Sequence, residues 1–269
     1  MAGENGALEE LGVQVRNIQE TIGFWAVINH GVAWKKLEET YKQLKQFFAL
    51  PDNEKRRYLI NELSIGYVPP KSTKYITSII NENTKKDLNE TLITALERPT
   101  DHPLIKAGTR FVGPNQWPEG LPGFRDAIVS YQQEILKLGR KLLPIFSVAL
   151  ELPPSYFDQY FTDPVMWSRN AHYPAEVPEK NQYGIAPHSD HSFLTMLPTT
   201  EVPGLQILSQ NGNWIDAKYI DKGILVNTGE FLNRWTNGRF IPTPHRVVPP
   251  EKDRYSIATF FNPSPETVA

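Results

Sequence analysis

Cysteine is absent from the 269 residues of this chain, and long apolar runs are absent as well. Without cysteine the protein can form no disulfide bond and can use no thiolate as a nucleophile or metal ligand. No stretch approaches the ~18 consecutive apolar residues of a transmembrane helix. Residues 1–12 are neither basic nor apolar enough for a signal peptide. We therefore expect no membrane association, and a reducing, cytoplasmic location fits this composition.

An excess of charge of either sign is also missing. The 28 Lys and Arg residues nearly balance the 30 Asp and Glu residues, and the formal net charge at pH 7 is −2. Such a chain creates no overall field that would attract nucleic acid or an anionic membrane. We expect neither as a partner, and nothing in the sequence indicates an oligomeric state.

Hydrophobic spacing divides the chain into an N-terminal helical and mixed region, residues 1–120, and a second region, residues 121–269, with a long helix and a β-rich part. We expect both regions to form one compact unit. Apolar residues at 37, 41, 44 and 48 predict a helix that ends near Pro51. The same spacing over residues 124–142 predicts a longer helix, with a kink at Pro144.

From Met166 onward the chain consists of short β-rich runs separated by Pro, Gly and Asn. The turn sequence at residues 211–213 predicts a hairpin between strands at 205–208 and 214–215. Residues 72–89 are polar and poorly periodic, which indicates a loop or a short hairpin. The sequence thus predicts a mainly β fold with flanking helices around a double-stranded β-helix, or jelly-roll, core.

The segment His188-Ser189-Asp190 has the spacing of a metal site. On a β-strand, alternate side chains share a face, so His188 and Asp190 would point to one place and Ser189 away from it. Together with the distant His245 they form the triad of two histidines and one carboxylate that leaves coordination positions open on non-haem Fe(II). Zinc with a bound water, as in a hydrolase, is the inorganic alternative.

A second pair with the same spacing follows in Arg254-Tyr255-Ser256. A guanidinium and a hydroxyl on one face of a strand are suited to hold a carboxylate by charge-assisted hydrogen bonds. A hydrolase needs no such anchor. A 2-oxo acid does, because it can chelate iron at one end while the protein holds its far carboxylate.

With these segments, the chain resembles the plant-type, isopenicillin N synthase-like family of Fe(II)/2-oxoglutarate-dependent dioxygenases. The resemblance covers nearly the whole sequence. Its further motifs, in chain order, are Gly23–Val32, Phe47–Pro51 with Glu54 and Lys55, Gly113–Pro118, Pro203–Gln206, Val226–Glu230 and Asn237–Phe240.

The resemblance implies a binding role for six residues. The implied iron ligands are His188, Asp190 and His245, and the implied contacts of 2-oxoglutarate are Arg254, Ser256 and Tyr173. It also implies O2 as a co-substrate, ascorbate as a candidate reductant, and decarboxylation of 2-oxoglutarate to succinate and CO2. The expected outcome is hydroxylation of a small organic metabolite, although desaturation or ring chemistry would use the same residues.

The chain departs from the family pattern in two ways. The sequence Asn-Tyr-Tyr-Pro, frequent in plant relatives, reads Ala171-His172-Tyr173-Pro174 here, with Asn170 one residue earlier. The short Pro-rich strand that usually opens the family is missing, and the chain stops soon after Phe261, so we expect that one or both ends are incomplete. The four remaining histidines, His30, His102, His172 and His191, are expected to be structural or peripheral.

Substrate contacts are predicted where the family shapes its pocket, at Arg169, Phe193, Phe260, Asn262 and Tyr67. Arg169 would pair with a carboxylate or phenolate of the substrate, or else with an acidic side chain on the barrel rim. The two phenylalanines could equally be core residues. The polar segment after Tyr67, including Tyr75, is expected to act as a lid.

Three alternatives remain open from the residues alone. A zinc hydrolase would use the same ligands but would leave Arg254 and Ser256 without a role. An inert metal-binding module would keep the ligands without turnover. A third alternative is an oxidase of the same family that takes electrons from its substrate or from ascorbate and binds no 2-oxo acid.

Overall fold

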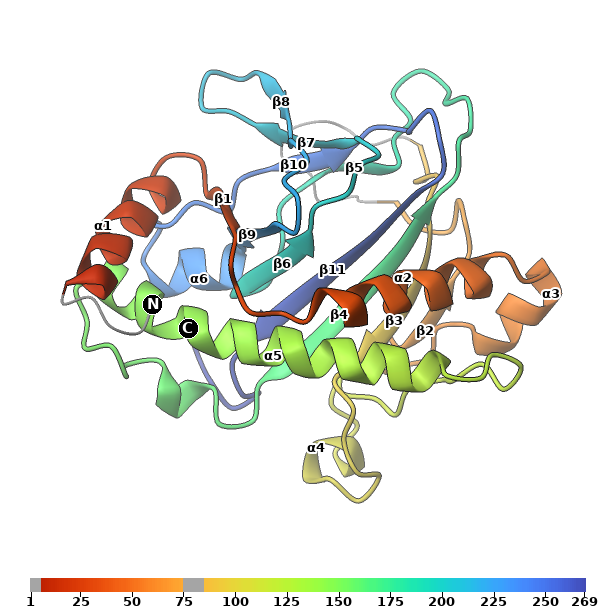
Figure 1. Ribbon diagram of the computed structural model, residues 1–269, viewed down its shortest axis with the longest axis horizontal. Coiled ribbons are helices and arrows are strands. Elements are labelled where there is room, and N and C mark those ends of the chain that lie inside the picture. The colour runs from red at the N-terminus through yellow and green to blue at the C-terminus, as the bar shows by residue number, and fades with distance from the viewer. Residues whose placement is uncertain (1–5, 75–84) are drawn as a thin grey trace.

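Two antiparallel sheets face each other and form the predicted jelly roll (Figure 1). The structure is a computed structural model that describes residues 6–74 and 85–269. The larger sheet has the order β1 (Phe24–Val27), β9 (Ile224–Thr228), β6 (Leu194–Pro198), β11 (Arg254–Asn262), β4 (Val165–Tyr173), β3 (Glu90–Ala95) and β2 (Gly66–Val68). The smaller sheet has the order β5 (Ile185–His188), β10 (His245–Val247), β7 (Leu205–Leu208) and β8 (Trp214–Asp216).

Helices cover the outer face of the larger sheet (Figure 1). The helices in the described part of the chain are α1 (Ala7–Gln19), α2 (Trp34–Phe48), α3 (Asp52–Lys55), α4 (Pro103–Lys106), α5 (Phe124–Ala149) and α6 (Glu230–Trp235), with 3-10 turns η1 (Arg56–Tyr58) and η2 (Asp158–Tyr160). Of these, α4 projects away from the sheet (Figure 1). The helices predicted from apolar spacing are α2 and α5. The second continues through Pro144 to Ala149.

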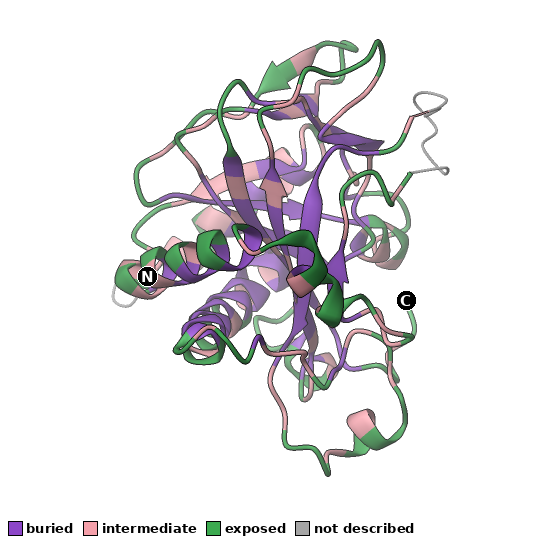
Figure 2. Ribbon diagram, turned by 90° about the vertical axis from the view of Figure 1, so that its right-hand side faces the viewer, coloured by how far each residue is buried: buried purple, intermediate pink, exposed green. Residues whose placement is uncertain are grey.

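The main hydrophobic core lies between these helices and the larger sheet. Leu44 of α2, Ile135 of α5 and Phe261 of β11 are each at most 1% exposed. Each such buried side chain contributes roughly 1.5 to 3 kcal/mol, which is enough to fix the helices on the sheet. Figure 2 shows the result, with buried strands at the centre and exposed loops and outer helix faces around them.

A smaller apolar cluster lies between the two sheets and includes Ala171, Tyr173, Leu205 and Val247. The site described below opens beside it. The predicted hairpin is confirmed, because β7 and β8 pair around a turn in which Gly212 has a φ of +79°. Within the described part of the chain, no helix combines the length and apolarity that a membrane span requires.

Candidate metal centre

His188, Asp190 and His245 converge between the two sheets. Strands β5 and β10 pair so that His245 lies opposite His188. The Nε2 atoms of His188 and His245 lie 3.8 and 3.6 Å from Oδ1 of Asp190. One ligand atom from each residue lies within 4.8 Å of the others, a spacing that fits a single metal ion.

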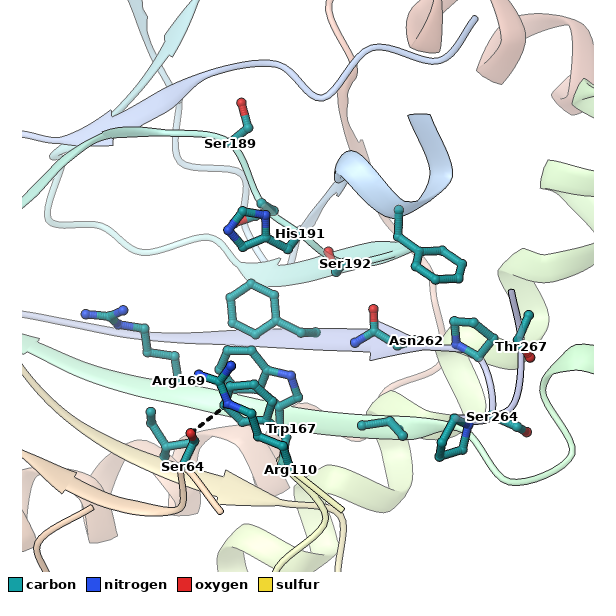
Figure 3. Close-up of a pocket in the computed structure, with 18 of the residues that line it drawn as sticks. Ser64, Arg110, Trp167, Arg169, Ser189, His191, Ser192, Asn262, Ser264 and Thr267 are labelled. Atoms are coloured by element: carbon teal, nitrogen blue, oxygen red, sulfur yellow. Dashed lines mark hydrogen bonds between the residues drawn. The ribbon is translucent and has the colours of Figure 1, made fainter. Parts of the chain in front are cut away.

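The strand predicted across His188-Ser189-Asp190 is shorter than expected. Strand β5 ends at His188, and Asp190 lies in the following loop. Ser189, between them, is among the residues that line the wide cavity described below, but its hydroxyl points away from the other side chains drawn there (Figure 3). The loop turns there because Gly229 allows a close approach of the backbone. A Cβ atom on Gly229 would lie 2.5 Å from the carbonyl oxygens of Asp190 and Ser192.

Backbone carbonyls orient both imidazoles. The Nδ1 atom of His188 lies 2.8 Å from the carbonyl oxygen of Ala186, and that of His245 lies 3.1 Å from the carbonyl oxygen of Thr243. A carbonyl only accepts, so Nδ1 carries the hydrogen in each ring. This leaves Nε2 of each ring, the nitrogen that faces Asp190, as the atom available to a metal.

Two buried side chains hold the carboxylate of Asp190. Thr195 Oγ1 and Asn227 Nδ2 donate hydrogen bonds to its Oδ2 over 2.6 and 2.7 Å. The other oxygen, Oδ1, faces the two imidazoles. The sequence analysis did not identify Thr195 or Asn227 as site residues. The available signal was an asparagine inside the apolar strand β9, where an unpaired amide would be costly.

Electrostatics prepare His188 and Asp190 for a cation. Burial, with a smaller effect of His245, lowers the pKa of His188 to about 3. Burial would raise the pKa of Asp190, but His245, through its charge and a hydrogen bond, and then His188 and Thr195 lower it well below the usual range. His188 is thus neutral and Asp190 ionised near pH 7, which are the forms that bind metal. For His245, burial lowers the pKa, but the charge of Asp190 and a hydrogen bond to it raise the pKa above its usual value, so a metal would displace a proton from that ring.

A narrow cavity of about 50 Å³ leads from this cluster into the barrel. Arg254, Ser256 and Tyr173 line it together with the three candidate ligands. The alternation predicted for Arg254 and Ser256 is present in β11, where they pair with Tyr173 and Ala171 of β4. Asn170 lies on the other side of β4, where its amide donates to the carbonyl of Leu92.

Arg254 is a buried cation that lacks a full set of partners. It is only 4% exposed, and its guanidinium lies 5.0 Å from the centre of the Tyr173 ring. Its Nε and Nη1 atoms have no hydrogen-bond acceptor among the described residues. Burying a guanidinium with unmet donors is costly, so the residues present fit a carboxylate ligand at this end of the cavity.

A wider cavity of about 680 Å³ opens on the other side of His188 and Asp190. Phe111, Trp167 and Phe260 form one wall as a continuous stack with ring centroids 4.1 Å apart at both steps. Arg169 lines both cavities and extends from β4 at the end opposite Ser264 and Thr267 (Figure 3). Its Nη2 donates to Oδ1 of Asn89 over 3.1 Å.

The predicted substrate contacts divide into two groups. Arg169, Phe260 and Asn262 line the wide cavity. Tyr67 and Phe193 do not, because both are 0% exposed in the main core. Tyr67 donates a hydrogen bond to Glu90, and Phe193 packs against aromatic rings of Phe146, Phe157, Phe161 and Trp235.

These two assignments are therefore corrected. The lid is expected in the segment around Tyr67 and Tyr75, and its part at Tyr75 lies outside the described residues. The cavity wall includes residues that sequence analysis did not select, namely Ser64, Arg110, Phe111 and Trp167. They come from distant segments and share no motif, so only the fold brings them together. His191 also lines this cavity, and its ring contacts Glu230 over 2.8 Å.

Comparison with known proteins is consistent with this geometry. Two family models match the chain. The model described as the 2OG-Fe(II) oxygenase superfamily matches residues 164–263. The model described as "non-haem dioxygenase in morphine synthesis N-terminal" matches residues 3–120. The chain is 34% identical to kihadalactone A synthase of Citrus sinensis, over 91% of this chain and 75% of that protein. It is 31% identical to the 2-oxoglutarate-Fe(II) type oxidoreductase hxnY of Emericella nidulans, over 99% of this chain and 78% of that protein.

A solved structure gives the same result. A full-length protein of Neurospora crassa, crystallised in complex with α-ketoglutarate, superposes with a TM-score of 0.85, at 27% identity, over 99% of this chain and 83% of that one. The comparisons and the geometry agree. Two family models together cover most of the chain, relatives exceed 30% identity, and a His-Asp-His cluster shares a cavity with a buried arginine. The chain therefore belongs to the 2OG-Fe(II) oxygenase superfamily and is an oxidoreductase that depends on Fe(II), 2-oxoglutarate and O2.

Proposed function

We propose that this enzyme hydroxylates a small organic acid that carries a flat, unsaturated ring. In this proposal His188, Asp190 and His245 hold the iron. Arg254, Ser256 and Tyr173 hold the far carboxylate of 2-oxoglutarate. The bound iron supplies the redox chemistry that couples decarboxylation of 2-oxoglutarate to oxidation of the substrate. The single observation that supports the assignment of these roles is the buried Arg254, which has unmet hydrogen-bond donors and lines the cavity that begins at the metal cluster.

In this proposal the two cavities bind different ligands. The narrow one lies inside the barrel and holds the co-substrate away from water, between Arg254 and the metal cluster. The wide one opens toward solvent and receives the substrate. Phe260 and Arg169 line both, so each can contact the substrate close to the place where it is oxidised. Enclosure of this kind protects a reactive oxidant from side reactions.

Three observations support the substrate class. A cavity of about 680 Å³ is of the size that holds a small molecule. The stack that ends at Phe260 offers an aromatic surface against which a planar ring can lie. Arg169 places a guanidinium beside the metal cluster, suited to a carboxylate or phenolate.

The relatives provide supporting context. Kihadalactone A synthase is named for a small-molecule product. A structure of JOX2, with a TM-score of 0.79 and 26% identity, contains 2OG, Fe and JA. The isopenicillin N synthase-like label and the cytoplasmic location stay predictions from the sequence.

The test is a screen for substrate-triggered succinate formation. Purified enzyme with Fe(II), 2-oxoglutarate and O2 is incubated with aromatic carboxylic acids, phenols, aliphatic acids and neutral amides of the same acids. We expect the aromatic acids to stimulate succinate formation most, and Arg169→Gln to raise the KM for the best acid about tenfold or more. Its neutral amide should be affected far less. The acidic substrate class would be contradicted if a neutral compound were the best substrate and if wild type and Arg169→Gln turned it over equally well.

A further inference from the structure

A row of four side chains in mutual contact, Lys55, Glu90, His172 and Asp253, connects α3, β3, β4 and the residue before β11. Lys55 Nζ contacts Glu90 Oε2 over 2.7 Å, and the other Glu90 oxygen lies 2.8 Å from Nδ1 of His172. The Nε2 atom of His172 lies 3.1 Å from Oδ2 of Asp253. The side chains of Lys55, Glu90 and His172 are 10, 6 and 12% exposed, whereas that of Asp253 is 55% exposed. The row thus runs from the protein interior to the surface.

His172 is the link between the two carboxylates of this row. An ionised carboxylate can only accept hydrogen bonds, so both contacts are fully used when both ring nitrogens carry hydrogen. Tyr67 donates a further hydrogen bond to Glu90, at the inner end of the row.

The same imidazole contacts both sequence neighbours of Arg254. Asp253 accepts a hydrogen bond at Oδ2, and its Oδ1 accepts from the backbone N–H of Ala175. The ring of Tyr255 stacks on His172 with centroids 4.6 Å apart and an interplanar angle of 11°. Phe48 of α2 packs near the same imidazole at 5.6 Å.

The end of β11 at Arg254 has fewer paired neighbours than its other end. Strand β6 pairs with β11 at Thr259–Phe261, at the far end, whereas at Arg254 the strand pairs with Tyr173 of β4 (Figure 1). Contacts from His172 therefore supplement the backbone pairing where the strand begins. A guanidinium that must point into a narrow cavity is sensitive to small shifts of its backbone.

We propose that His172 is a positioning residue for 2-oxoglutarate binding, which acts by fixing Asp253 and Tyr255 on either side of Arg254. This inference rests on the proposed role of Arg254 as the anchor of the co-substrate. His172 itself lies on the other face of β4 from Tyr173 and lines neither cavity. Its effect is on affinity for 2-oxoglutarate, while the chemical step at the metal is unchanged.

The test measures binding of 2-oxoglutarate by calorimetry to the full chain loaded with Zn(II), which prevents turnover. His172→Phe keeps an aromatic ring against Tyr255 but donates no hydrogen bond, and Asp253→Asn changes a largely exposed side chain with little risk to folding. We expect each to weaken binding about tenfold, because His172→Phe removes the imidazole contacts to Glu90 and Asp253, and Asp253→Asn removes the carboxylate that the imidazole contacts. In the Fe(II) enzyme the KM for 2-oxoglutarate should rise while kcat at saturation stays unchanged. Tyr67→Phe, which removes only the inner contact to Glu90, is the matched control and should leave binding within about twofold.

A double-variant comparison separates this inference from the proposed function. If His172 acts through Arg254, then His172→Phe should cause no further loss of binding in an Arg254→Leu background. Equal losses in both backgrounds would overturn the inference, as would normal binding by both His172→Phe and Asp253→Asn. Normal binding by Arg254→Leu alone would instead contradict the anchor in the proposed function. Should His172→Phe fail to fold, Asp253→Asn carries the same comparison.

Discussion

The amide of Asn227 fixes the carboxylate of Asp190. Its Nδ2 donates to Oδ2 over 2.7 Å, and both side chains are at most 6% exposed. Because Thr195 donates to the same oxygen, only Oδ1 is left to face the imidazoles of His188 and His245. A carboxylate held in this way presents one oxygen to a metal, so the remaining coordination positions of that metal stay open for the co-substrate and O2.

Replacing Asn227 by alanine should therefore weaken metal binding. Loss of a partner that orients a ligand typically lowers affinity about 10- to 100-fold. The measurement is a titration of the metal-free protein with Fe(II) under anaerobic conditions. Asn170→Ala is the matched control, because Asn170 is an equally buried asparagine that bonds Leu92 from strand β4 of the same sheet. Equal metal affinity in both variants would show that Asn227 has no orienting role.

Arg254→Leu should weaken binding of 2-oxoglutarate strongly. Loss of a charged contact in a buried site costs roughly 2 to 5 kcal/mol, whereas Ser256→Ala removes one neutral hydrogen bond worth about 1 kcal/mol. Calorimetry on the Zn(II)-loaded protein gives both values. Arg246→Leu serves as a control, since Arg246 packs between the rings of Tyr183 and Trp214 and lines neither cavity. A larger loss of binding in Ser256→Ala than in Arg254→Leu would be incompatible with the anchor.

Phe193→Leu and Phe260→Leu should have opposite effects. Phe193 lies in the core, so its replacement should lower the melting temperature and leave the substrate KM unchanged. Phe260 ends the aromatic stack at the cavity, so its replacement should raise the substrate KM about threefold to tenfold with a smaller effect on stability. Thermal unfolding and steady-state kinetics on the same preparations check both expectations. A raised substrate KM in Phe193→Leu alone would reverse the assignment.

Asp87→Asn should stabilise the protein at neutral pH. Burial raises the pKa of Asp87 from 3.8 to about 6, although a hydrogen bond from Ala186 and the charge of Arg169 oppose the rise. The folded protein then binds this proton more tightly than the unfolded chain, so its stability falls as the pH rises from about 4 to about 6 and is constant above. The gain from Asp87→Asn should be small below about pH 4 and reach up to about 3 kcal/mol at pH 7. Urea unfolding at both pH values measures it, and an equal gain at both would contradict the expected titration.

The sequence predicted the parts of the site that depend on local spacing. Arg254 and Ser256 alternate along β11 as expected, and His188 and His245 meet because the strands that carry them pair. Asp190 reaches the same place from a loop, which strand alternation did not foresee. The burial of Tyr67 and Phe193 could not be predicted, since an aromatic residue near a site fits a pocket wall and a core equally well. Asn227 and His172 acquire their roles through contacts with Asp190, Glu90 and Asp253, which are distant in sequence.

The most direct test of this account is the metal dependence of succinate formation by wild type, Asp190→Ala and His245→Ala. With one Fe(II) per chain and 2-oxoglutarate, wild type should form succinate when an accepted substrate is present, and should form none with Zn(II) or after treatment with a chelator. Both variants should remain folded by circular dichroism and form no succinate with Fe(II). Succinate formation by chelator-treated wild type, or at the wild-type rate by either folded variant, would contradict the assignment of His188, Asp190 and His245 as the iron site.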